Sequence, residues 1–249
     1  DINGNGTDLV SLFSGVSIND LGNIIAVGYP YASSEDGYVR VLNWNGTSWS
    51  QLGSNIRHGG SDSKSGWAVD LNSTGDIVAI SSPDLGLEGS SWSYNGRVQV
   101  FKWNGSNWNT LGTQIYGDNA YDKFGTEISL NDAGDIMAVG TKFANSNGND
   151  AGLVKIYSWN GSSWVQLGSD LIGESAGDYF GNSISLNSAG NILAVGAPIN
   201  NSSNGEVKIF EWDGSFWNSI KEFNGTTGEQ LGFSVSLNDA GDRIVISEN

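Results

Sequence analysis

The sequence contains no cysteine and only three prolines in 249 residues. The absence of cysteine excludes a disulfide framework, a thiolate metal site and a cysteine nucleophile, so redox chemistry does not indicate a compartment. The single histidine, His58, leaves few arrangements for general acid–base catalysis. No apolar run approaches the ~20 residues of a membrane-spanning helix, and no basic-then-apolar leader precedes Asp1. We therefore expect no membrane insertion by this segment.

Positive charge is also scarce. The chain has 11 Lys and Arg against 27 Asp and Glu, which gives a net charge of −16. Such a balance repels nucleic acid and anionic membranes and leaves no basic patch for either partner. Paired catalytic carboxylates, a phosphate-binding loop and a metal-ligand cluster are not visible either. The sequence thus predicts a protein that is not an enzyme.

What the sequence has is an internal repeat. One motif occurs five times, centred on Asn19, Asn72, Asn131, Asn187 and Asn238. The copies are separated by 53, 59, 56 and 51 residues. A period of about 55 residues indicates a repeat fold, and 36 glycines beside 27 aromatic residues (10 Trp, 8 Tyr, 9 Phe) are typical of many short strands joined by tight turns.

The third repeat illustrates the pattern of strands. Ile128 and Leu130 alternate with polar residues, as in a strand with one apolar face, and an Asn-x-x-Gly turn follows. The unbroken apolar run 136–139 predicts a strand covered on both faces. A third strand, 152–159, ends at an Asn-Gly hairpin turn, and a short fourth strand begins at Trp164.

Each repeat therefore predicts a four-stranded antiparallel meander, and the fold class is all-β. The period and the buried second strand favour a β-propeller of four complete blades plus strands one and two of a fifth. We expect a single domain over 1–249, with repeats at about 1–53, 54–112, 113–168, 169–221 and, in part, 222–249. Three explanations of the partial blade are open: a longer natural polypeptide, a short last blade, or completion by another chain.

Short motifs flank these strands. Phe124-Gly125 and Phe180-Gly181 precede strand one, Gly196-Ala197-Pro198 follows strand two, and Val27-Gly28-Tyr29-Pro30 is a near copy of the latter. These motifs resemble the FG-GAP repeats of integrin α-subunit β-propellers, and the resemblance covers nearly the whole chain. It implies adhesion or ligand binding by loops outside the cell rather than catalysis. The family's Asp-rich calcium loops are replaced here by Asn-x-x-Gly hairpins. The Trp-Asn-Gly-x-x-Trp hairpins are also similar to repeats in large secreted or surface proteins of marine microbes.

Acidic residues recur before strand one of each repeat. They are Asp8, Asp62, Asp122, Asp178 and Glu229. One hypothesis is that they bind cations or a polyhydroxyl ligand on one face; the alternative is that each carboxylate accepts backbone N–H bonds within its own turn. The N-terminal Asp1, Asn3, Asn5 and Asp8 also match part of a calcium loop, without its distal Glu. Apart from this candidate Ca²⁺ site, we expect no cofactor.

Tryptophans bracket every outer hairpin. Trp49, Trp108, Trp164 and Trp217 begin the fourth strands, each five residues after another Trp. They either stack on sugars, as in a lectin, or clamp the hairpin and cover the outer core. Sequons occur at Asn5, Asn45, Asn72, Asn104, Asn160, Asn201 and Asn224, and exposed ones would carry glycans in a eukaryotic secretory pathway.

These observations predict a secreted or cell-surface module with a structural or adhesive role. Its expected partners are other proteins or extracellular glycans, with assembly alongside further copies or neighbouring domains. The alternative is a carbohydrate-binding propeller that uses the Trp rims or the acidic residues.

Overall fold

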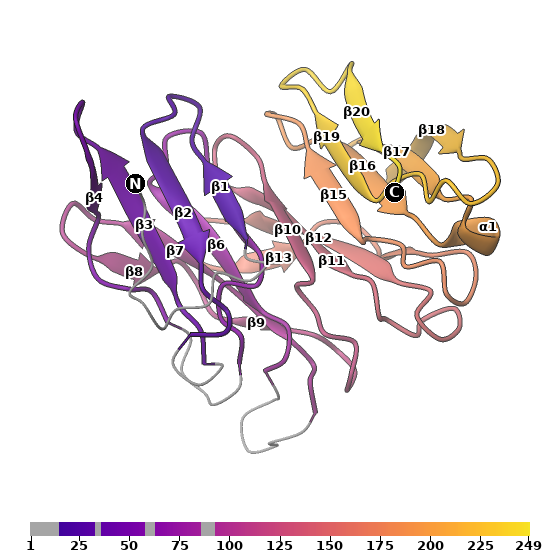
Figure 1. Cartoon of the computed structure of the whole chain (residues 1–249), viewed down its shortest axis with the longest axis horizontal. Coiled ribbons are helices and arrows are strands. Elements are labelled where there is room, and N and C mark those ends of the chain that lie inside the picture. The colour runs from indigo at the N-terminus through magenta and orange to yellow at the C-terminus, as the bar shows by residue number, and fades with distance from the viewer. Residues whose placement is uncertain (1–14, 33–35, 58–62, 86–92) are drawn as a thin grey trace. The chain divides into compact units, whose positions relative to one another are not determined.

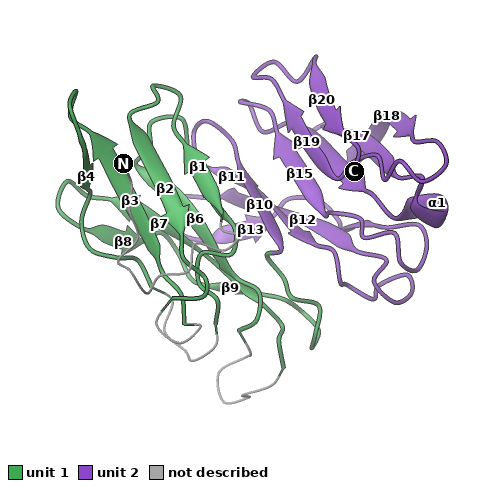
Figure 2. Ribbon diagram, viewed as in Figure 1, with its two compact units in different colours: residues 1–125 green, residues 126–249 purple. Residues whose placement is uncertain are grey.

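A computed structural model describes residues 15–32, 36–57, 63–85 and 93–249. The described chain is almost entirely β-structure, with one four-residue helical turn, α1 (Asn200–Ser203), whose Asn201 and Ser202 have positive φ (Figure 1). The all-β prediction is confirmed. The chain divides into two compact units, Asp1–Gly125 (unit 1) and Thr126–Asn249 (unit 2) (Figure 2). The single domain over 1–249 stays a prediction.

Unit 1 contains two antiparallel sheets, each with its four main strands in sequence order. The first consists of β1 (Val16–Ile18), β2 (Ile24–Gly28), β3 (Val39–Trp44) and β4 (Trp49–Gln51). The second consists of β5 (Val69–Leu71), β6 (Ile77–Ser82), β7 (Arg97–Trp103) and β8 (Trp108–Thr110), with β9 (Ile115–Tyr116) pairing to β7.

Unit 2 repeats the same topology. Its first sheet consists of β10 (Glu127–Leu130), β11 (Ile136–Thr141), β12 (Leu153–Trp159) and β13 (Trp164–Gln166), with β14 (Leu171–Ile172) pairing to β12. The next consists of β15 (Ser183–Leu186), β16 (Ile192–Ala197), β17 (Glu206–Trp212) and β18 (Trp217–Asn224), and the last of β19 (Ser234–Leu237) and β20 (Ile244–Ser247). The predicted meanders are confirmed, and these sheets are compatible with propeller blades.

The Asn-x-x-Gly turns form as expected between the first two strands. In the fourth repeat, the Asn187 Oδ1 atom accepts hydrogen bonds from the backbone N–H groups of Asn191 and Ile192, at 3.0 and 2.9 Å. Gly190 within this turn has φ +72°, which a residue with a side chain rarely adopts. The repeated asparagines are therefore turn formers, because their amide oxygens replace a backbone acceptor.

The cores lie between successive sheets of the same unit. In unit 1, Val39 and Val41 of the first sheet pack with Val69, Ile80 and Phe101 of the second. In unit 2, two clusters join β10–β14 to β15–β18 and β15–β18 to β19–β20. Burying both faces of the second strand explains its unbroken apolar sequence, and β6 and β16 are buried at every position.

Facing glycines bring adjacent sheets together. A Cβ atom on Gly196 would lie 2.1 Å from the carbonyl oxygen of Gly232 in the next repeat. The same contact joins Gly28 to Gly66, and Gly140 to Gly181. The glycine near the end of strand two of one sheet and the glycine before strand one of the next are thus required by the same close backbone approach.

The outer edge of the sheets differs from the prediction. We expected a short fourth strand followed by a linker, but the linkers return to pair with the third strand as β9 and β14. In the fourth repeat, β18 stays continuous past a bulge and covers the whole of β17. A two-residue strand has no period of its own, so its pairing follows from the third strand beside it.

Candidate functional site

The acidic residues that precede strand one of each repeat are called the entry acids below. Those in the described part of the chain lie in tight turns, and each accepts a local hydrogen bond there. Asp178 is buried and accepts from the backbone N–H of Ser175 at 2.7 Å. Glu229 accepts from the N–H of Thr226 at 2.6 Å, and hydrogen bonds from the side chain and backbone of Thr226 lower the pKa of Glu229. This geometry favours the local-turn alternative for both residues.

The other entry acids differ. Asp122 is buried, and its Oδ2 atom accepts from the Asn119 side chain at 3.0 Å. Asp8 and Asp62 lie outside the described residues. Before the second sheet of unit 1, the position equivalent to Asp122 and Asp178 holds Ser63, whose hydroxyl donates to the Asp36 carbonyl at 2.7 Å. The described residue at that position of the second sheet is thus a serine, and a site formed by all five acids stays a prediction.

The structure gives no support for a metal centre in its described part. Among the described residues, no group of three or more His, Asp or Glu side chains is placed to hold a metal ion. The candidate calcium loop of Asp1, Asn3, Asn5 and Asp8 lies outside those residues, so it stays a prediction.

Each outer hairpin carries a pair of packed tryptophans. The ring centroids of the four pairs are between 5.4 and 5.6 Å apart: Trp44–Trp49, Trp103–Trp108, Trp159–Trp164 and Trp212–Trp217. The fourth-strand rings are buried or half-buried, whereas Trp44 is exposed. The pairs therefore cover the turn ends of the hairpins. This arrangement favours the hairpin clamp over sugar stacking, the two alternatives that the sequence left open.

Two of these pairs also fasten one sheet to the preceding one. The Trp217 Nε1–H donates to the Leu167 carbonyl at 3.0 Å, and a Cβ atom on Gly168 would lie 2.9 Å from the Trp212 ring. In unit 1, Trp108 donates to the Leu52 carbonyl at 2.9 Å in the same way. Because these indole N–H groups are used internally, Trp108 and Trp217 are less suited to bind sugar than their spacing suggested.

The sequons have different surroundings. Asn45, Asn104 and Asn160 lie at exposed hairpin tips, where each Oδ1 atom accepts two backbone N–H bonds. Asn201 and Asn224 are also exposed, and Asn5 lies outside the described residues. Asn72 is buried, and its amide bonds Thr74, Asp76 and Ile77. The folded chain leaves no room for a glycan at Asn72.

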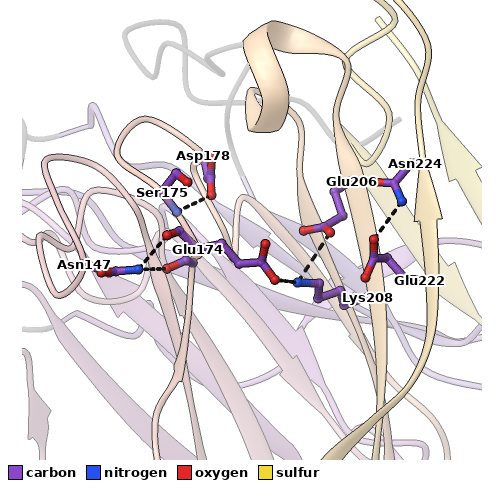
Figure 3. A network of polar contacts seen from close by, with 9 residues as sticks. Asn147, Glu174, Ser175, Asp178, Glu206, Lys208, Glu222 and Asn224 are labelled. Carbon is purple, nitrogen blue, oxygen red and sulfur yellow. Dashed lines mark hydrogen bonds and ion pairs between the residues drawn. The ribbon is translucent and has the colours of Figure 1, made fainter.

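One network of charged residues was missed by the sequence analysis. In β17, Glu206 and Lys208 are both at least nine-tenths buried, with Lys208 Nζ 3.4 Å from Glu206 Oε1. Lys208 also binds Glu174 of the preceding linker, and Glu222 of β18 lies opposite Lys208 (Figure 3). Asn147 fixes the linker by donating to the carbonyls of Gly173 and Glu174, at 3.1 and 2.6 Å.

Burial decides the electrostatics of this network. It raises the pKa of Glu206 to about 7, with Lys208 opposing the shift and the carboxylates of Glu222 and Glu174 adding to it. Three carboxylates share one ammonium, so the group with least access to water holds its proton most strongly. The only sequence signal was the alternation of charged and apolar residues along strand three, Glu206-Val207-Lys208-Ile209.

A polar cavity lies at the outer edge of the second sheet of unit 1. It is shallow and largely open to solvent, with about 420 Å³ of space above its lining of Gln99, Thr110, Gly112, Thr113, Gln114 and Tyr116. Gln99 is buried, and its Nε2 atom donates to the carbonyls of Val100 and Gly112 at 3.1 and 3.2 Å. The sequence did not indicate this site, because its lining comes from two strands and a linker that were assigned only structural roles.

No protein-family model matches the chain, and a search of the curated proteins finds no match. The resemblance to FG-GAP repeats therefore stays a prediction based on the motifs. Among the described residues, no helix is long and apolar enough to cross a membrane.

Proposed function

We propose that this chain is a β-propeller module of the FG-GAP type, secreted or at the cell surface, with a structural or adhesive role. Its partners are other proteins or extracellular glycans, and it works by binding rather than by catalysis. The facing glycines support the repeat type, because Gly196 of the Gly-Ala-Pro motif and Gly181 of a Phe-Gly motif both lie at close backbone approaches between sheets.

The proposed role is supported by the hydrogen bonds of the entry acids and of the fourth-strand tryptophans. Asp178 and Glu229 bind their own turns, and Trp108 and Trp217 bind the preceding repeat. The carboxylates are thus used within their own turns, and the two indole N–H groups are used between repeats. Variable loops on such a scaffold are suited to recognition, since loops change without disturbing the strands.

Adhesion and turnover assays test this role together. Beads coated with the chain are expected to be retained, in a saturable manner, on surfaces coated with extracellular matrix proteins or polysaccharides. Peptide, ester and glycoside probes are expected to stay intact. Retention on no surface, or turnover that survives repeated purification, would contradict the role. A crystal structure should show the sheets arranged radially, and a layered sandwich would contradict the propeller.

A second candidate is carbohydrate binding, and the cavity beside Gln99 favours it. The lining offers two amides, two threonine hydroxyls and a tyrosine. Such groups match the hydroxyls and the apolar face of a sugar ring. This site differs from the Trp rims and the acidic residues that the sequence suggested.

A further inference from the structure

Arg97 lies in β7 and bonds Gln114, one of the residues that line the unit 1 cavity. Its side chain is buried, with 4% of the residue exposed. Its Nη1 atom donates to the Gln114 Oε1 atom at 2.9 Å, while Nε and Nη2 are buried and have no hydrogen-bond partner among the described residues. A guanidinium has five N–H donors and is always charged, so leaving two of its nitrogens unsatisfied is costly.

The other buried cations on third strands have carboxylate partners. In β12, Lys155 Nζ lies 3.0 Å from Asp170 Oδ1, and in β17, Lys208 binds Glu174 and Glu206. Asp170 immediately precedes β14 just as Gln114 immediately precedes β9. The cations themselves stand two positions apart, since the register aligns Lys155 with Gln99 and Leu153 with Arg97. Both residues lie beside the third strand. The second sheet therefore has an amide where the third sheet has the carboxylate that neutralises its cation.

The chemistry of Gln114 leaves Arg97 incompletely satisfied. An amide offers one oxygen, and here that oxygen also accepts from the Tyr116 hydroxyl at 2.6 Å. A carboxylate offers two oxygens, which a guanidinium binds with two parallel N–H bonds. Since Nη1 and Nη2 are bonded to the same carbon, a carboxylate at the place of the Gln114 amide would accept from both.

Gln114 is also the link between Arg97 and the cavity, because it is exposed and lines the cavity. The rest of the lining is uncharged and rich in hydrogen-bonding groups. Gln99, Thr110 and Thr113 provide amide and hydroxyl groups, and Tyr116 adds an aromatic ring.

We propose that this cavity binds a carboxylate-bearing saccharide of the uronic acid type. The ligand carboxylate displaces the Gln114 amide and pairs with Nη1 and Nη2 of Arg97, while its hydroxyl groups bond Gln99, Thr110 and Thr113. This inference rests on the carbohydrate-binding candidate function and specifies the ligand class and the residue that recognises it.

Calorimetric titration of the full chain with digalacturonic acid tests the inference, with the neutral galactose disaccharide as comparison. The acidic disaccharide is expected to bind at least tenfold more tightly than the neutral one, and more weakly as salt is raised, because the contact is between charges. If neither disaccharide binds at millimolar concentration, both the inference and the candidate function at this cavity fail. Equal binding of the two leaves the candidate function standing and overturns the inference.

A variant that supplies the carboxylate from within sharpens the test. Gln114→Asp reproduces the arrangement of Asp170 and should pair with Arg97, so binding of digalacturonic acid is expected to weaken at least tenfold while the melting temperature stays the same or rises. Ser169→Ala changes the linker beside Asp170 in unit 2 and should leave binding unchanged. Unaltered binding by Gln114→Asp, or equal loss in both variants, would overturn the role of Arg97.

Discussion

Replacing Glu206 by glutamine should stabilise unit 2 above pH 7 and remove part of its dependence on pH. Glu206 is buried in β17 with 4% of its surface exposed, beside Lys208 and near the carboxylates of Glu174 and Glu222. Glutamine keeps the shape of the protonated carboxyl and carries no charge at any pH. The substitution therefore removes only the ionisation of this group.

The magnitude follows from the two pKa values. The pKa of Glu206 rises from 4.5 to about 7 on folding, chiefly through burial, and each pH unit between the values is worth about 1.4 kcal/mol. Below pH 4.5 the group is protonated in both states and costs nothing. Between pH 4.5 and 7 the unfolded chain ionises first, so stability falls as pH rises. Above pH 7 the loss levels off at about 3 kcal/mol.

Denaturant titrations at pH 5, 6, 7 and 8, with amide hydrogen exchange of β17 and β18, measure this difference. Glu206→Gln should exceed the unfolding free energy of the native chain by less than about 1 kcal/mol at pH 5 and by about 3 kcal/mol at pH 8. The difference between the two proteins isolates the ionisation of Glu206, because every other residue is the same in both. Asp213→Asn, at an exposed acid whose pKa is lowered by hydrogen bonds from Phe216 and Ser215, should leave the slope between pH 5 and 8 unchanged. A variant with the native slope, or one less stable than the native chain at pH 8, would refute the reasoning.

Three further predictions concern the contacts between repeats and the accessibility of the sequons. Gly196→Ala places a methyl group 2.1 Å from the Gly232 carbonyl oxygen and should lower the unfolding free energy by about 3 kcal/mol. Gly161→Ala, which has open space around it, should lower the unfolding free energy by only about 1 kcal/mol through its positive φ. Equal losses of the two variants in denaturant titration would contradict the close-approach argument. Trp217→Phe removes the hydrogen bond to the Leu167 carbonyl and should lower the unfolding free energy by at least about 1 kcal/mol. Trp49→Phe should lower it less, because the Trp49 indole N–H has no hydrogen-bond partner among the described residues. A larger loss of stability in Trp49→Phe would count against the clamp. When the chain is expressed through a eukaryotic secretory pathway, it should carry glycans at Asn45, Asn104 and Asn160 but not at buried Asn72. Peptide mass spectrometry measures the occupancy of each site. Full occupancy of Asn72 in folded protein would show that its turn opens.

The sequence by itself determined the strands and the turns between them. Alternation at Ile128 and Leu130 and the apolar run 136–139 gave the strands of the third repeat, and the Asn-Gly pair at 160–161 gave its outer hairpin. These features depend on residues that are close in sequence, since side-chain period and turn chemistry are local properties. The facing pair Gly196 and Gly232 was visible as two motifs but not as one contact.

Only the tertiary structure decided which polar groups are buried and what they meet. Glu206 and Arg97 occupy the same place at the start of a third strand, yet one lies beside an ammonium and two carboxylates and the other beside an amide. The difference comes from linkers that follow the fourth strand and return to the third, and from the continuous strand β18. The pairings of β9 and β14 with the third strands join residues 17 or 19 positions apart. The charge, burial and partners of a side chain therefore follow from the assembled sheets rather than from its neighbours in sequence.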